Sequence, residues 1–381
     1  MPLLIHLLGC GPGDAVGDVR DDSARSSGLV PLTWYRSEPQ ETWADAAAGL
    51  DWALSQLGAL PPPDGALLVD EVAADRVRFR LDLDALALPD PARNVLEITA
   101  AELEAHPGTG SDDLGRFLLR SLHEPWRYLA ATGACATLAD WRATRPVESV
   151  VYAVTTSLLT SGERRITLPD AAADWSTIAM FAEEGEGSLV TGDFAPVEAE
   201  TVDVMPNGQF RYAVYGADGA LLPAATASPA GTPGKCAWCH EATLEAGTSA
   251  NASAPGYLDY AAWITRRDAD QALIEDYRAS LATSIAYATP VVHESGERLV
   301  EGFLLPDAAR VAREWGMTEA EVVAVLGEGT ESLDELGWTG RYRRADVDAA
   351  APWSSAIRTL SNVREQVPGE TFAPAEVGGC R

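Results

Sequence analysis

Asn207-Gly208-Gln209-Phe210-Arg211-Tyr212-Ala213-Val214-Tyr215 is the clearest local structural signal in this 381-residue chain. Asn-Gly is typical of a two-residue hairpin turn, whose central positions need positive φ angles. The aromatic and β-branched residues from Phe210 to Tyr215 favour a strand directly after that turn. We therefore expect a β-hairpin from about Glu198 to Leu222.

The residues on both sides of this hairpin follow other patterns. Apolar residues recur every three or four positions from Trp43 to Leu57, as in an amphipathic helix, whereas apolar and charged residues alternate from Val77 to Leu83, as in a half-buried strand. Helical spacing returns over Tyr260–Ala286, and Thr318 with Glu321 forms a capping box that begins another helix. The sequence thus predicts an α+β fold.

The net charge of −29 excludes one class of partner. Binding to a phosphate backbone depends on clustered Lys and Arg, so nucleic acid is not expected as a partner. No run of about 18 apolar residues is present, and a helix spanning a bilayer is not expected either. Any contact with a membrane would then come from a lipid anchor.

The first of five cysteines lies in Leu7-Leu8-Gly9-Cys10, which resembles a bacterial lipobox. In such a signal the apolar stretch enters the export machinery, and the cysteine is lipidated and becomes the new N-terminus. This resemblance implies a lipid-anchored protein of the periplasm or cell envelope. The alternative is an apolar first strand with a buried cysteine.

Two further cysteines, Cys135 and Cys380, are far apart in the sequence. In an oxidising compartment they could form a disulfide that ties the C-terminal tail to the first domain, which we expect over residues 29–165. Two free thiols are the alternative, because a bridge requires Cα atoms within about 7 Å of each other.

The last two cysteines belong to Cys236-Ala237-Trp238-Cys239-His240. Cysteines three residues apart lie near one face of a helix, so both thiols can add to the vinyl groups of one porphyrin, and the adjacent histidine can ligate its iron. A dithiol redox pair is an alternative use of the same spacing. A structural zinc site would need four ligands, and the sequence has no second Cys-x-x-Cys or His-x-x-x-His pair.

By these residues the site resembles that of the c-type cytochromes, and the resemblance covers Cys236, Cys239 and His240. It implies covalently attached haem c, assembly outside the cytoplasm and one-electron transfer to a redox protein whose identity the sequence does not reveal. Small cytochromes do not have the long segments that precede Cys236 and follow His240 in this chain. A haem enzyme, or a gas or redox sensor with an open iron site, is therefore the alternative.

The sixth iron ligand has two candidates downstream of His240 and one upstream. Met317, the more distant of the two downstream candidates, would raise the reduction potential, whereas the nearer His293 would lower it. His123 could approach from the first domain. An open position would permit gas binding or peroxide chemistry.

Cations near the motif or in a dense group could contact haem propionates or a redox partner. Lys235, the only lysine of the chain, directly precedes Cys236. Arg341, Arg343 and Arg344 form the dense group, and a surface salt-bridge cluster with Asp346 and Asp348 is the alternative for them. The proposed contacts are Lys235, Arg341, Arg343 and Arg344.

The chain is long enough for two or three packed units. Two segments suggest where these units divide. One is rich in Gly, Asp and Ser and ends at Gly28, and the other is an Ala, Thr, Ser, Gly and Pro linker before Cys236. We expect a truncated lipoprotein signal and flexible tether over 1–28, a mixed α/β domain over 29–165, a β-rich region over 166–225 and a mainly helical covalent-haem region over 226–381.

Overall fold

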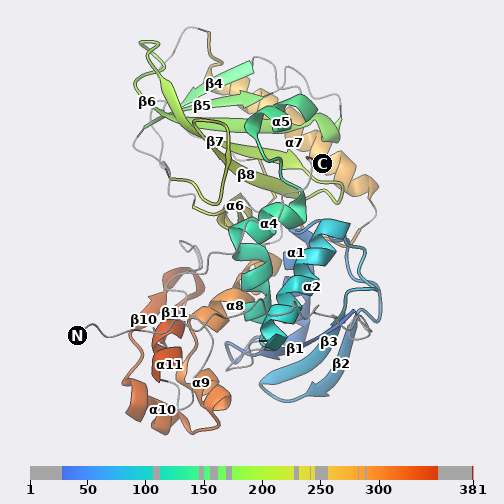
Figure 1. Cartoon of the computed structure of the whole chain (residues 1–381), viewed down its shortest axis with the longest axis vertical. Helices are drawn as coiled ribbons and strands as arrows, with labels where there is room; N and C mark the ends of the chain where they lie inside the picture. Colours follow the sequence, from blue (N-terminus) through green and yellow to red (C-terminus); the bar gives the residue numbers. More distant parts are fainter. Residues whose placement is uncertain are drawn as a thin grey trace, which may run out of the picture.

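The hairpin predicted from Asn207-Gly208 forms the fourth and fifth strands of a six-stranded antiparallel sheet in the computed structural model (Figure 1). Each strand pairs with its sequence neighbour, in the order β4-β5-β6-β7-β8-β9. The structure describes residues 28–105, 112–145, 150–154, 162–168, 174–226, 231–240, 242–244, 256–281, 283–287, 290–350 and 380. The strands are β4 (Val150–Val154), β5 (Glu163–Leu168), β6 (Ala179–Glu186), β7 (Ala195–Val204), β8 (Phe210–Gly216) and β9 (Leu221–Leu222).

The turn between β7 and β8 confirms the predicted hairpin. The turn itself is longer than the two residues expected, because five residues separate Val204 from its partner Phe210. Gly208 has a positive φ, a conformation that glycine adopts without steric cost, whereas Asn207 does not. Asn207 fixes the turn to the N-terminal part of the chain, because its Nδ2 donates to the carbonyls of Ser55 (2.8 Å) and Ala59 (2.9 Å).

Helices cover both faces of this sheet (Figure 1). Helix α7 (Tyr260–Ser280) packs on one face, where Trp263 stacks on Tyr152 with ring centroids 4.8 Å apart. Helix α5 (Leu138–Thr144) packs on the other face through Trp141, whose indole nitrogen donates to Asp203 at 2.8 Å. Side chains alternate along a strand, so successive residues of β8 face different helices.

The N-terminal part of the chain forms a second sheet, in the order β1-β3-β2, with helices packed against it. One apolar core runs through this part and continues onto strands β6, β7 and β8 of the six-stranded sheet. The elements are β1 (Leu29–Tyr35), α1 (Trp43–Ser55), β2 (Leu67–Val72), β3 (Arg76–Asp82), α2 (Asp90–Ala105), α3 (Leu114–Leu118), the π-helical turn η2 (Leu119–His123) and α4 (Pro125–Thr132).

Helix α8 (Pro290–Leu304) returns to the N-terminal part and packs against α1 and α3. Glycines allow these close approaches, since a Cβ at Gly49 would lie 2.6 Å from the backbone of Gly296 and one at Gly115 would clash with the Leu299 carbonyl. The remaining elements are α6 (Pro233–His240), the 3-10 turns η3 (Trp175–Thr177) and η4 (Asp334–Leu336), α9 (Ala308–Trp315), α10 (Glu319–Leu326), β10 (Glu331–Leu333), β11 (Trp338–Arg341) and α11 (Arg344–Ala350).

The α+β class is confirmed, but the packed regions differ from the expected division of the chain. The expected boundary between residues 165 and 166 falls inside β5, because β4 and β5 pair within the six-stranded sheet. Region 226–381 is not one helical unit, since α7 packs on the sheet whereas α8 packs on α1 and α3. Of the expected tether 1–28, only Gly28 is described. Among the described helices, none has the length and apolar character needed to cross a membrane.

Candidate functional site

The motif lies in helix α6 and occupies its last five residues. The buried Thr232 precedes the helix, and Pro233 is its first residue, a position that tolerates the missing N–H of proline. Helical spacing places positions 236, 239 and 240 within one turn and on neighbouring parts of one surface. The backbone therefore places these three positions on one side of α6.

Helix α6 packs against β8, α4 and η2, at the junction between the six-stranded sheet and the N-terminal helices (Figure 1). Ala237 is buried in the main apolar core. Cys236 is half-buried against the same core, with its Sγ 3.9 Å from the Thr232 carbonyl oxygen. Burial raises the pKa of the Tyr128 phenol of α4, and the neighbouring Cys236 raises it further.

His240 is half-buried beside an aromatic side chain of β8. Its ring centroid lies 5.5 Å from that of Tyr212, and the two planes are inclined by 33°. The Tyr212 ring also makes an edge contact with Phe210, at 6.2 Å between centroids. The backbone of Tyr212 is fixed independently, since its N–H donates to the Tyr128 hydroxyl at 3.2 Å. The imidazole therefore lies at one end of an aromatic row on β8.

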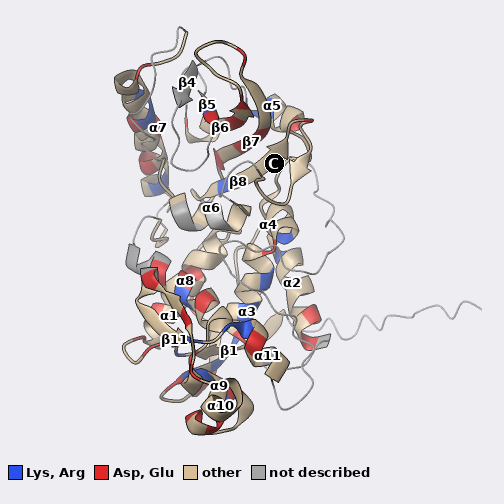
Figure 2. Cartoon of the chain, turned by 90° about the vertical axis from the view of Figure 1, so that its left-hand side faces the viewer, with Lys and Arg blue, Asp and Glu red and all other residues tan. Residues whose placement is uncertain are grey.

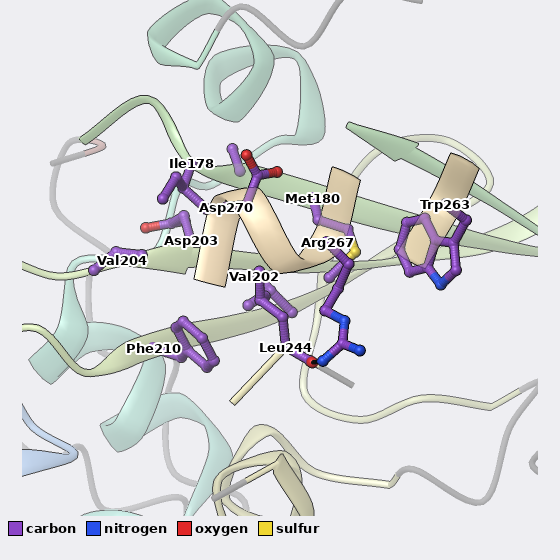
Figure 3. A pocket seen from close by; sticks show the side chains of 11 residues that line it. Ile178, Met180, Val202, Asp203, Val204, Phe210, Leu244, Trp263, Arg267 and Asp270 are labelled. Carbon is purple, nitrogen blue, oxygen red and sulfur yellow. Dashed lines mark hydrogen bonds between the residues drawn. The ribbon is translucent and has the colours of Figure 1, made fainter. Parts of the chain in front are cut away.

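The chain after the motif is tied to α7. Figure 3 shows Leu244 beside a narrow pocket between α7 and the sheet, with Arg267 reaching back toward it. The Arg267 guanidinium donates to the Leu244 carbonyl at 3.4 Å, and the Leu244 N–H donates to Gln271 at 3.0 Å. Ala242 has a positive φ, which ends the helix sharply and directs the chain to α7. These contacts fix where α6 ends.

His123, one of the candidate ligands, lies directly beside α6. It is buried at the end of the π-helical turn η2, and a Cβ placed on Gly234 would lie 3.2 Å from its Nδ1. Burial lowers the pKa of His123 to about 3, because an apolar environment disfavours the imidazolium. The structure thus holds a neutral imidazole against the first turn of the motif helix. Single π-helical turns are frequent at functional sites.

Arg278 of α7 is a residue that no pattern in the sequence singled out. Its guanidinium carbon lies 5.4 Å from the Phe210 ring centroid and 4.5 Å from that of Tyr287. Its Nε donates to the Gly208 carbonyl at 2.9 Å, whereas its terminal nitrogen Nη2 has no acceptor among the described residues. Burial lowers the pKa of Arg278 to about 10. A buried cation with a free donor therefore lies at the other end of the aromatic row.

The structure does not bring Met317 to the motif. It packs on the apolar cluster of α9, α10 and α11, and the label of α10 lies far from that of α6 in both Figure 1 and Figure 2. The expectation from sequence distance fails because α9 and α10 form a small core of their own. The side chain of His293 lies outside the described residues, although its backbone belongs to the first turn of α8.

The arginines of the Arg341–Arg344 stretch also lie in this distant part, and two of them point inward. Arg344 is buried, donates to Glu314 at 2.6 and 2.9 Å and lies over the Phe303 ring. Arg341 is buried over Trp338, whereas the exposed Arg343 pairs with Asp346 at 2.9 Å, as the salt-bridge alternative anticipated. Arg341 and Arg344 thus have partners inside the protein, and Arg343 has one at the surface.

The remaining predicted residues have mixed outcomes. The structure joins Cys135 to Cys380 by a disulfide, with Cα atoms 4.3 Å apart. The side chains of Lys235 and Cys239 and the whole of Cys10 lie outside the described part. Within that part, no three His, Cys, Asp or Glu side chains are arranged to hold a metal ion.

Comparisons with known proteins do not assign the chain to a class. No protein-family model, no curated protein and no solved structure matches it. The functional argument therefore depends on the motif and on the residues that surround it.

Proposed function

We propose that this chain is an extracytoplasmic haem c protein that transfers or stores single electrons. The observation that carries the proposal is Cys-x-x-Cys-His on one helix, with the first cysteine half-buried and the histidine beside Tyr212. In this proposal Cys236 and Cys239 hold haem c covalently and His240 ligates its iron. The bound iron would supply reversible one-electron chemistry.

The surroundings of α6 support a role in positioning such a group. Tyr212 limits rotation of the His240 ring, and Tyr128 holds the backbone of Tyr212. Arg278 offers a buried donor to a carboxylate, which is the chemistry of a haem propionate. We therefore favour Arg278 over the Arg341–Arg344 group as the propionate contact.

The disulfide between Cys135 and Cys380 supports an oxidising compartment, since such bridges persist outside the cytoplasm. Attachment through the lipidated Cys10 to a membrane surface belongs to the same proposal. The net charge of −29 suits a basic redox partner better than an acidic one. In Figure 2 acidic residues lie in both the upper and the lower part of the molecule.

A haem enzyme or sensor with an open iron position is the second candidate, and the placement of Met317 favours it. The competing sixth ligands are histidines. His123 lies against the first turn of α6, and α8, whose first turn contains position 293, packs on α3, the helix that precedes η2. Six-coordinate low-spin iron that does not bind carbon monoxide would exclude the open-site function.

Expression with a cytochrome c maturation system tests the main proposal. We expect haem to remain with the polypeptide on a denaturing gel, and Cys236→Ala with Cys239→Ala to abolish the haem stain completely. Cys380→Ser is the control, because it removes a cysteine that lies outside the motif and pairs with Cys135, and it should leave the stain unchanged. Wild-type protein without attached haem overturns the proposal. Reversible oxidation of its two motif thiols would then identify a dithiol protein.

A further inference from the structure

A second cleft lies on the opposite face of β8 from His240 and encloses about 320 Å³. Its walls come from the ends of α1, α4 and α5, the start of α2, the turn η3 and the β7–β8 hairpin. It thus lies where the N-terminal helices meet the six-stranded sheet. Small-molecule sites occur preferentially at such junctions, and this volume is at the lower end of their usual range.

The floor of the cleft carries positive charge. Arg145 and Arg211 are the only charged residues that line it within the described chain, and their side chains are 9% and 6% exposed. Both guanidinium groups contact the same oxygen, Oδ1 of Asp203, which lies behind them and is 3% exposed. Asp203 also accepts from the Trp141 indole, so its carboxylate is fully used behind the floor.

Different partners hold the two arginines at the floor of the cleft. Arg211 is held by Asp203 and by the carbonyls of Thr132 (3.0 Å) and Gly133 (3.1 Å) at the end of α4. Arg145 follows the last residue of α5, and one of its terminal nitrogens donates to the Thr144 hydroxyl at 2.7 Å. Both guanidinium groups are therefore held from behind by Asp203, and together they carry the positive charge that lines the cleft.

The walls above this floor are apolar. Trp175 lines one side and is held in place by stacking on Tyr277, with ring centroids 3.9 Å apart and planes within 10° of parallel. Leu57, Pro89 and Met205 line the other sides. Such walls favour the hydrocarbon body of a ligand, whereas the floor favours its anionic end.

We propose that this cleft binds a small organic carboxylate, with its carboxylate against Arg145 and Arg211 and its apolar body against Trp175 and Met205. The charge of the lining excludes ammonium ligands, because a cation would meet two guanidinium groups. The apolar walls distinguish the site from one for a free inorganic anion, which would need polar donors on several sides. Burial lowers the pKa of Arg145, and a bound carboxylate would oppose that shift. The site does not depend on the haem proposal.

Isothermal titration calorimetry with matched probes tests the proposal. The probes are benzoate, 3-phenylpropionate and octanoate, each compared with its uncharged primary amide, and the protein is the full chain. We expect at least one carboxylate to bind with a Kd below about 1 mM and its amide to bind at least about tenfold more weakly. Absence of binding by all three acids, or equal binding of acids and amides, overturns the proposal.

Substitutions locate the binding site. Arg145→Gln should weaken carboxylate binding about tenfold, equivalent to about 1.4 kcal/mol, and leave amide binding unchanged. Arg142→Gln is the matched control, since it removes the same charge three residues earlier on α5, where the exposed Arg142 lies over Phe181 outside the cleft. Binding by Arg145→Gln at the wild-type affinity would contradict the assignment.

A second variant keeps the test valid if Arg145→Gln does not fold. Pro91→Phe changes the half-buried Pro91 of the cleft wall to a larger side chain and retains both arginines. We expect it to abolish binding of acids and amides alike, because it fills the space rather than altering the charge. Unchanged carboxylate binding by this variant would place the ligand elsewhere.

Discussion

The two faces of β8 differ in chemistry although they share a backbone. Tyr212 faces α6, where the site is built of aromatic rings, a thiol and an imidazole. Arg211, the preceding residue, faces α5, where two guanidinium groups share one buried carboxylate. One strand can support both sites because successive side chains point to opposite faces.

The same difference sets how each face responds to substitution. Aromatic contacts contribute about 0.5–1.5 kcal/mol each beyond the area that they bury, so loss of one is tolerated. Removal of one partner from a buried ion pair leaves an uncompensated charge in a low-dielectric environment and costs about 3–5 kcal/mol. We therefore expect the arginine face to be important for stability and the aromatic face to be important for the cofactor.

Asp203→Asn should produce the largest loss of stability. It leaves Arg145 and Arg211 without their shared carboxylate, and we expect the free energy of unfolding to fall by about 3–5 kcal/mol in urea titrations. Asp218→Asn is the matched control, because the exposed Asp218 caps the β8–β9 turn and its replacement amide can still accept from the Ala220 N–H. A loss below about 1 kcal/mol for Asp203→Asn would show that the ion pairs are not essential to this face.

The same Asp203→Asn variant tests whether the two faces are independent. If they are, its folded fraction should still attach haem when it is produced with the maturation system. Loss of haem from folded protein would show that the arginine face positions α6 through β8.

Cys380→Ser should have the next largest effect on stability. The disulfide with Cys135 closes a loop over a sequence separation of 245, and its removal should lower the free energy of unfolding by about 2–4 kcal/mol. Reduction of wild-type protein with dithiothreitol should reproduce this loss, whereas the variant should not respond to the reductant. Thioether links to haem are not reduced, so attached haem should remain in both cases. Equal stability of reduced and oxidised wild-type protein would contradict the expectation.

Features carried by neighbouring residues could be predicted from the sequence. The Asn207-Gly208 turn and the capping box at Thr318 depend on interactions within a few positions, and the structure has both. The motif on α6 is also local, since five consecutive residues define its spacing. Short-range patterns therefore predicted the fold class, the hairpin and the candidate cofactor site.

Features assembled from distant segments could not be predicted in this way. The cleft combines Arg145, Trp175 and Arg211, which lie on three separate elements with no periodic relation in the sequence. Sequence distance placed Met317 near the iron, but packing of α9 on α10 keeps it in another core. Arg344 was expected to contact a propionate because it belongs to a dense cationic stretch, and the sequence did not reveal its buried partner Glu314, 30 residues earlier. Each case depends on tertiary contacts that have no local signal.

His123→Gln should have the smallest effect, and it tests the aromatic face. The folded-state pKa of His123 is about 3, below its ordinary value of 6.5, so the folded protein binds fewer protons than the unfolded chain between these values. Stability contributed by this group is therefore present above pH 6.5 and is lost as the pH falls toward 3. Glutamine cannot titrate, so wild-type protein should lose about 2 kcal/mol more stability than the variant between pH 7 and pH 5.

Urea titrations of both proteins at the two pH values measure this difference. Equal pH dependence would mean that His123 is protonated, or accessible to water, in the folded state. The absorption spectrum of the haem-loaded variant adds a second readout, because loss of an iron ligand changes the spectrum whereas loss of a buried packing residue does not. A changed spectrum would show that His123 ligates the iron, and an unchanged one would leave position 293 or an open site opposite His240.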